Sequence, residues 1–146
     1  MEPLENQRQI WQRVCSPEPP RERMDLRDLA LRAGETEAAL RRAAGQLAGS
    51  QRQQAITLAG GAGEEVAVLK GIHYLDTGET LRLKPVPAPG GSIRALLREC
   101  YFRCLRAQGE YTARTLEPRF GGTFQSLAQQ NQLRCLALAR LLGMLA

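Results

Sequence analysis

The sequence predicts an all-α protein, a four-helix bundle in which a long crossover joins two helical hairpins. Apolar residues recur at three- and four-residue steps in four segments, which is the spacing of one helix face. Segments rich in proline and glycine separate them, and one of these is long enough to run the length of a bundle. The predicted bundle covers residues 25–146, with helices at about 25–47, 51–75, 92–117 and 121–145.

The last third of the chain has the clearest helical pattern. Its two apolar faces comprise Ile93, Leu96, Leu97, Cys100, Tyr101, Cys104, Ala107 and Tyr111 in the first helix, and Phe124, Leu127, Ala128, Leu133, Leu136, Leu138, Leu141 and Leu142 in the second. Pro118 and the pair Gly121-Gly122 separate the two faces. We therefore expect two antiparallel helices joined by a turn.

The first hairpin has a weaker pattern. Asp25 can act as the N-cap of its first helix, because its carboxylate can accept hydrogen bonds from free backbone N–H groups of the first turn. The second helix contains Gly60, Gly61 and Gly63 in its middle, and each costs about 1 kcal/mol relative to alanine. We expect either close approach of a neighbouring helix or a local bulge to compensate for this cost.

Residues 76–91, DTGETLRLKPVPAPGG, lack a helical period and connect the two hairpins. If the second and third helices run parallel, this segment has to cover about 36 Å, the length of a helix of about 24 residues. Sixteen extended residues reach about 53 to 58 Å. A lengthwise crossover is therefore feasible, and it distinguishes this topology from a simple up-down-up-down bundle.

Residues 1–24 are predicted to form an N-terminal arm and a proline-rich linker. Ile10, Trp11 and Val14 form an apolar cluster, and three prolines follow within SPEPPRER. We expect Trp11 to dock either on the bundle or on a neighbouring subunit.

Composition narrows the classes of function. The net charge of +5 comes from arginines spread through every segment, which is typical of solvated helix surfaces and does not favour nucleic-acid binding. The amino terminus is polar, and no apolar run approaches the roughly 20 residues of a membrane helix, so we expect a cytoplasmic protein without membrane contact. The cysteines are irregularly spaced, which favours reduced thiols over a disulfide framework; they are Cys15, Cys100, Cys104 and Cys135.

Three segments resemble ferritin-like proteins of the rubrerythrin type. LAGGAGEEVAVLKGIHYLDTGE, at 58–79, resembles their second helix, in which LA-x-x-E-x-x-H precedes a leucine and a TG turn. CLRAQGEY, at 104–111, resembles the third-helix pattern E-x-x-A-x-x-x-Y, with Cys104 at the glutamate position. GTFQSLAQQNQLRCLALARLLG, at 122–143, resembles the fourth helix. The resemblance implies a ferritin-like bundle and an oxidoreductase or iron-handling role.

Most ligands of the di-iron centre that this resemblance implies are missing. Such a centre takes a glutamate from each of two helices and an E-x-x-H motif from each of the other two. The matching positions hold Glu35 in the first helix, Ala62 and Glu65 in the second, Cys104 in the third, and either Asn131 and Arg134 or Gln132 and Cys135 in the fourth. The single histidine, His73, lies two turns beyond Glu65, too far along the axis to share a site with it. We expect that the di-iron centre has been lost.

Two functions remain open. The first is a non-catalytic structural or interaction module without a cofactor, forming a homodimer through an apolar helix face and the Trp11 arm. The second is a metal-binding or redox protein with an altered site for iron, zinc or copper, built from Glu35, Glu65, Cys104 and Cys135. The sequence contains neither a phosphate-binding glycine loop after a strand nor a G-x-S-x-G motif, so we find no support for another enzyme class.

Buried carboxylates and thiols would each have a structural role under the first function. Glu35 and Glu65 would need partners in the interior, for which Arg42 and Arg134 are candidates. The cysteines would pack as small apolar residues. A shifted helix register would instead bring Glu64, Glu99 or Glu110 into the interior, and these three carboxylates are the alternatives to Glu35 and Glu65.

Overall fold

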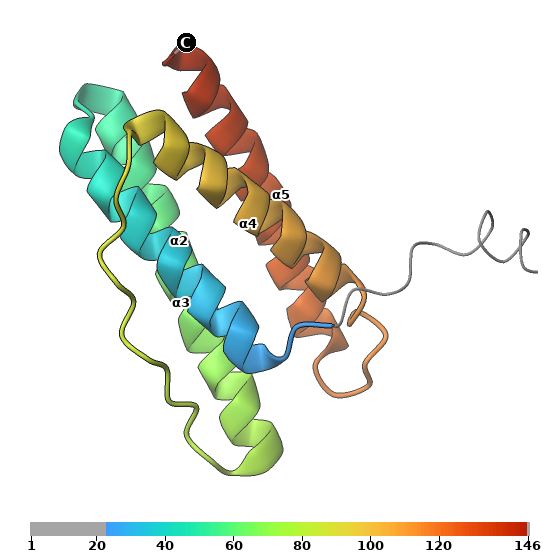
Figure 1. Cartoon of the computed structure of the whole chain (residues 1–146). Coiled ribbons are helices and arrows are strands. Elements are labelled where there is room, and N and C mark those ends of the chain that lie inside the picture. The colour runs from blue at the N-terminus through green and yellow to red at the C-terminus, as the bar shows by residue number, and fades with distance from the viewer. Residues whose placement is uncertain (1–22, 146) are drawn as a thin grey trace, which may run out of the picture.

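The computed structural model of the chain describes residues 23–145, which form four α-helices and no strand (Figure 1). The helices are α2 (Leu26–Gln46), α3 (Gly49–Thr77), α4 (Ile93–Thr112) and α5 (Gly121–Met144). The predicted all-α four-helix bundle is therefore confirmed. None of these helices is long and apolar enough to span a membrane. The predicted Trp11 arm lies outside the described residues.

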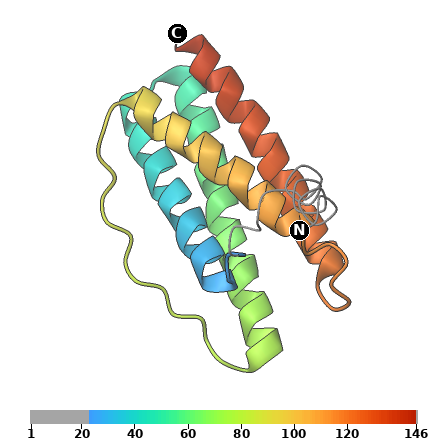
Figure 2. The ribbon, with the colours of Figure 1, turned by 45° about the vertical axis from the view of Figure 1, so that its right-hand side comes forward.

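The helices form two hairpins, α2 with α3 and α4 with α5, and the hairpins pack mainly through α2 and α4. The contact between α3 and α5 is much smaller. In both ribbon views the segment from 78 to 92 runs along the bundle, from the end of α3 back to the level at which α3 began (Figures 1 and 2). Helices α3 and α4 therefore run in the same direction, as the predicted lengthwise crossover requires.

The crossover is fixed against α2. Its residue Leu81 is buried, and Arg27 Nη1 of α2 donates a hydrogen bond to the carbonyl oxygen of Arg82 at 2.7 Å. Gly34 allows the segment to approach, since a Cβ at this position would lie 3.4 Å from Cγ2 of Val86. The crossover is thus held along α2 by packing and by a hydrogen bond.

Most helix boundaries agree with the sequence. Asp25 caps α2 as predicted, accepting a hydrogen bond from the backbone N–H of Asp28 at 2.8 Å. Ser92 caps α4 in the same way through the N–H of Ala95. Helix α3 is longer than predicted and ends where Gly78 adopts a left-handed conformation with φ of 74°.

The predicted end of the third helix at residue 117 is wrong, because α4 ends at Thr112. Residues 113–116 form turns, and the carboxylate of Glu117 accepts hydrogen bonds from the backbone N–H groups of Arg119 and Phe120. These hydrogen bonds hold the backbone immediately before the first residue of α5. The tight reversal also brings Gly121 against the carbonyl oxygen of Thr115, where a side chain would not fit.

The glycine-rich middle of α3 is a continuous helix, so the alternative of a bulge is not realised. Gly63 faces Glu37 of α2, and an added Cβ would collide with the end of that side chain. Gly61 faces Arg134 of α5. At these two glycines the missing side chain leaves room for the end of a long side chain from a neighbouring helix, whereas nothing lies within 4 Å of a Cβ at Gly60.

The core consists of two apolar clusters, one toward each end of the bundle. One is built around Leu40, Leu97 and Leu138, and the other around Leu69 and Tyr111. Between the two clusters, a layer of buried polar residues crosses the bundle at about its mid-length; its members are Thr36, Glu65, Asn131 and Arg134.

Candidate functional site

The buried polar layer is the candidate site, and its centre is the carboxylate of Glu65 on α3. Glu65 has only 2% of its surface exposed, and Arg134 of α5 has 5%. Tyr111 of α4 and Asn131 of α5 complete the group. We call these four residues the Glu65 network.

Every partner in the Glu65 network donates to the same carboxylate. Tyr111 Oη donates to Glu65 Oε2 at 2.7 Å, while Asn131 Nδ2 and Arg134 Nη1 donate to Oε1 at 2.8 and 2.9 Å. Arg134 Nη1 also donates to Asn131 Oδ1 at 3.2 Å. Both carboxylate oxygens are thus hydrogen-bonded, and the negative charge is paired with a guanidinium in a low-dielectric interior.

Local helix geometry positions these side chains. Asn131 and Arg134 are three residues apart and therefore share one face of α5. Asn131 Nδ2 is further held by the carbonyl oxygen of Leu127 at 2.9 Å. Gly61 leaves room for the guanidinium, since a Cβ there would lie 3.4 Å from Arg134 Nη2.

Burial and neighbouring charge fix the protonation states of Tyr111 and Arg134. Burial, the negative charge of Glu65 and the hydrogen bond to it all raise the pKa of Tyr111, so its hydroxyl stays a neutral donor. Burial alone lowers the pKa of Arg134, but the charge and hydrogen bond of Glu65 outweigh burial and raise this pKa. Arg134 is therefore a permanent cation beside Glu65.

The three described cysteines are free and buried near this layer. Burial raises the pKa of Cys100 to about 11 and that of Cys104 to about 12, although neighbouring arginines partly oppose the shift. Burial also raises the pKa of Cys135. These thiols are protonated at neutral pH, which disfavours nucleophilic chemistry.

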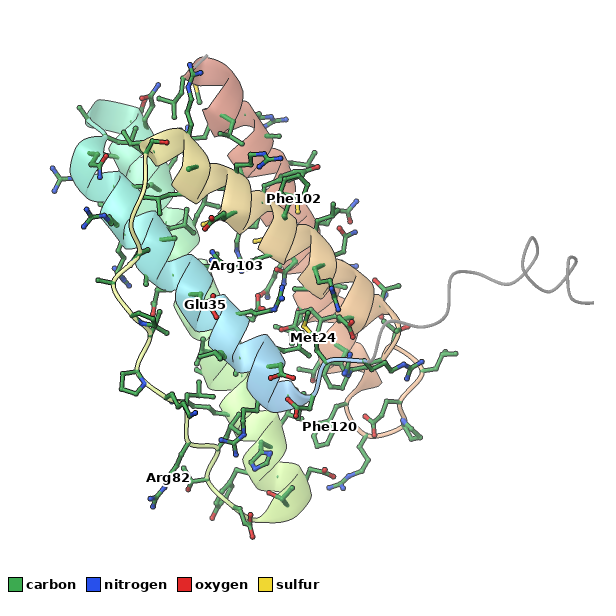
Figure 3. All side chains as sticks on the ribbon, viewed as in Figure 1. Met24, Glu35, Arg82, Phe102, Arg103 and Phe120 are labelled. Carbon is green, nitrogen blue, oxygen red and sulfur yellow. The ribbon has the colours of Figure 1, made fainter. Side chains whose placement is uncertain are left out.

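The predicted site residues are only partly brought together. Glu65 and Cys104 line the same small cavity, and Cys135 is buried nearby on α5. Glu35 lies at the edge of the bundle, with 35% of its side chain exposed and an ion pair of 3.5 Å to Arg103 (Figure 3).

Of the two arginines expected to pair with interior carboxylates, one does so and the other does not. The pairing of Glu65 with Arg134 is confirmed. Arg42 is exposed and is not the partner of Glu35, because its position on α2 faces solvent. Of the two registers open for the fourth helix, the structure buries both Asn131 and Arg134, and from the other pair it buries Cys135 alone.

The alternative carboxylates do not join the layer. Glu64 and Glu99 are exposed. Glu110 has 12% of its side chain exposed and pairs with Arg114 at 3.2 Å on the same helix. The sequence pattern placed Tyr111 on an interior helix face but did not identify its hydrogen bond to Glu65; the signal available was that a buried tyrosine hydroxyl usually finds a hydrogen-bond partner.

The residues present do not fit a di-iron centre. Within residues 23–145, no group of three or more histidine, cysteine, aspartate or glutamate side chains is placed to hold a metal ion. Both oxygens of Glu65 are already hydrogen-bonded, and the guanidinium of Arg134 lies within hydrogen-bonding distance of one of them. A cation entering here would have to displace a buried positive charge.

Comparisons with protein-family models, with curated proteins and with solved structures give no match to this chain. The ferritin-like resemblance therefore depends on the quoted sequence segments and remains a prediction.

Proposed function

We propose that this chain is a ferritin-like helical bundle that has lost its di-iron centre and acts as a non-catalytic structural or interaction module. The observation that carries the proposal is the buried ion pair between Arg134 Nη1 and Glu65 Oε1 at 2.9 Å. A guanidinium can neutralise a buried carboxylate with fixed hydrogen-bond geometry, so the interior needs no metal for charge balance.

The space around the Glu65 network supports a non-catalytic role. The adjoining cavity has a volume of about 10 Å³, which is room for about one water molecule. A substrate would therefore have no place beside Glu65 or Tyr111. The buried thiols, with pKa values raised by burial, are equally unsuited to attack a substrate.

Self-association is the interaction that we propose for this module. Large apolar side chains are exposed on the second hairpin: Phe102 and Leu105 on α4, and Leu133 and Leu136 on α5. Such side chains on a helical face are typical of protein interfaces, and a homodimer would cover them. A cytoplasmic location belongs to the same proposal, supported by the free thiols at Cys100, Cys104 and Cys135.

The metal content of tag-free protein tests this proposal. We expect inductively coupled plasma mass spectrometry to find no stoichiometric metal as purified, and none after anaerobic addition of iron(II), zinc or copper(I) followed by desalting. The melting temperature should be unchanged by these additions, because the Glu65 network binds no ligand that stabilises the fold. About two irons per chain would contradict the proposal, since that is the content of a di-iron centre.

A second candidate is the altered metal or redox site of Glu65, Cys104 and Cys135, with Glu35 at its edge. It is favoured by one observation, that Cys104 and Glu65 line the same cavity. The same experiment separates the two candidates. About one zinc or copper per chain that is lost in Cys104→Ser but kept in Cys15→Ser would establish the thiol site and overturn the metal-free module.

A further inference from the structure

A groove lies between α3 and α5, the two neighbouring helices that make the smallest contact in the bundle. Its volume is about 580 Å³, and most of its surface is apolar. The lining includes Thr57 and Leu58 of α3 and Ala137, Arg140 and Met144 of α5. An apolar groove between two helices is a typical docking site for an amphipathic segment.

The walls of the groove carry a positive charge that they do not balance themselves. Arg140 is exposed and is the only charged residue of the lining. Helix α5 contains no aspartate or glutamate, and α3 contains none before Glu64. The groove therefore matches an occupant that combines an apolar face with a carboxylate near Arg140.

The chain itself contains such a segment within residues 1–22, which lie outside the described part of the structure. Leu4, Trp11 and Val14 are seven and three residues apart, which is the spacing of one helix face. Glu2 and Glu5 supply carboxylates at the amino-terminal end of this stretch. The sequence of the segment is thus complementary to the groove in its apolar residues and in the charge at its amino-terminal end.

The groove lies about 30 Å from the start of α2. Thr36 and Glu65 belong to the same buried layer, and Thr36 is ten residues beyond Leu26, which corresponds to about 15 Å of helix. Thr57 is eight residues before Glu65, which adds about 12 Å. The diagonal of the bundle adds a lateral distance of about 14 Å, because packed helices lie about 10 Å apart. Together these displacements give a straight distance of about 30 Å.

The connecting chain is long enough to cover this distance. Val14 is nine residues before Arg23, the first described residue, and three prolines between them favour an extended chain. Nine extended residues span about 28 to 32 Å, and one helical turn from Val14 to Trp11 adds about 5 Å. The length of the connection therefore allows Trp11 to reach the groove of its own chain.

We propose that the amino-terminal segment docks in the α3–α5 groove of its own molecule, with Trp11 between Thr57 and Ala137. Glu5 precedes Trp11 by six residues, so it would lie about 9 Å farther along the groove, toward Arg140. The segment then covers the side of the bundle on which the two hairpins make the least contact. The groove shares no residue with the proposed dimer contact, so the two associations are independent.

Trp11 is the only tryptophan of the chain, so its fluorescence tests the proposal in the full-length protein. The emission should lie at a shorter wavelength than in the urea-unfolded chain, and acrylamide should quench it less. Ala137→Arg places a charged side chain in the groove and should shift the emission to the wavelength of the unfolded chain. Ala139→Arg is the matched control and should keep the native emission, since Ala139 is an exposed residue of α5 outside the groove.

Two results of these measurements would overturn the proposal. The first is a native emission equal to that of the unfolded chain. The second is the same emission in Ala137→Arg and Ala139→Arg. Melting curves check that each variant is folded, and Thr57→Arg, at an exposed position of α3, tests the groove if Ala137→Arg does not fold.

A mixture of two variants distinguishes docking within one molecule from docking on a second copy. Ala137→Arg keeps Trp11 but has a blocked groove, whereas Trp11→Phe has no tryptophan and keeps its groove. The emission of the mixture should stay at the long wavelength of Ala137→Arg alone, because each segment docks only on its own chain. A return to the shorter wavelength would show docking on a second copy and would overturn the proposal.

Discussion

Glu65 connects three helices through one carboxylate. It belongs to α3, and its hydrogen-bond donors come from α4 and α5. A buried carboxylate is costly unless its oxygens are hydrogen-bonded and its charge is paired, and here both conditions are met. The same residue therefore stabilises one arrangement of the helices and disfavours sliding of one helix past another, since a shift would leave a buried charge unpaired.

Tyr111→Phe isolates the contribution of one hydrogen bond to this arrangement. The ring keeps its stacking on Phe124, at a centroid distance of 6.2 Å, but Glu65 Oε2 loses its donor. We expect the free energy of unfolding to fall by about 1–3 kcal/mol in urea denaturation. Tyr101→Phe is the matched control, since Tyr101 is only partly buried, and should change stability by less than about 0.5 kcal/mol. Equal losses in the two variants would contradict a specific role for the Tyr111 hydroxyl.

The partners of Glu65 were predictable to different degrees. Arg134 was predictable because a buried carboxylate needs a cation and this arginine lies at an interior position of its helix. The role of Asn131 was not, since an uncharged amide in one of two open registers gave no reason to pair it with Glu65. Glu35 was expected in the interior but has 35% of its side chain exposed, because burial of a position near the edge of a helix face depends on how the helix rotates against its neighbours.

The turn between α4 and α5 shows how one element ends and the next begins. Pro118 limits how far a helix can continue, but it does not fix the last helical residue. The chain leaves α4 at Thr112, and Glu117 then binds two backbone N–H groups near the start of α5. The sequence pattern predicted the hairpin correctly and placed the end of its first helix too late, because these tertiary hydrogen bonds have no periodic signal.

The pair Gly121 and Gly122 tests the packing of this turn. A Cβ at Gly121 would collide with the backbone of Thr115, whereas nothing lies within 4 Å of a Cβ at Gly122. Gly121→Ala should lower the free energy of unfolding by about 1–3 kcal/mol, as strained insertions in packed sites do. Gly122→Ala should leave it unchanged or raise it by up to about 1 kcal/mol, because alanine is the better helix former. Similar effects at both positions, measured by urea denaturation, would contradict the close approach at Gly121.

The whole molecule consists of two apolar core clusters separated by the layer that holds Glu65. The bundle, its two hairpins and the crossover follow from helical periodicity and the length of one connection. The division of the core does not follow from them. Glu65, Asn131 and Arg134 are isolated polar residues in otherwise apolar faces, and the hydrogen bonds that join Glu65 to Asn131 and Arg134 span 66 and 69 positions of the sequence. Their common depth in the bundle is a property of the assembled fold.

Alkaline pH should destabilise the whole molecule through its buried thiols. The pKa values of Cys100 and Cys104 are raised from 9.0 to about 11 and about 12, so above pH 9 these thiols ionise in the unfolded chain and stay protonated in the folded one. Their contribution to stability is full below pH 9 and is lost as pH rises toward 11 and 12, by up to about 1.4 kcal/mol per pH unit for each thiol.

Urea denaturation at several pH values measures this loss. The free energy of unfolding should fall more steeply between about pH 9 and 10.5 in the native chain than in the double variant Cys100→Ala, Cys104→Ala. Parallel profiles for the two proteins would show that the thiols ionise equally in the folded and unfolded states, contrary to their burial.

The coupling free energy between Glu65 and Arg134 tests most directly whether an internal ion pair supports the centre of this bundle. Arg134→Met leaves a buried carboxylate uncompensated, and Glu65→Gln leaves a buried guanidinium; each should cost about 3–5 kcal/mol in metal-free buffer. The double variant removes both charges and keeps an acceptor for Tyr111 and Asn131, so it should cost less than the sum of the single variants by about 2 kcal/mol or more. Single losses that add within about 0.5 kcal/mol would show that the pair does not support the fold, and the account of a self-sufficient, metal-free interior would be wrong.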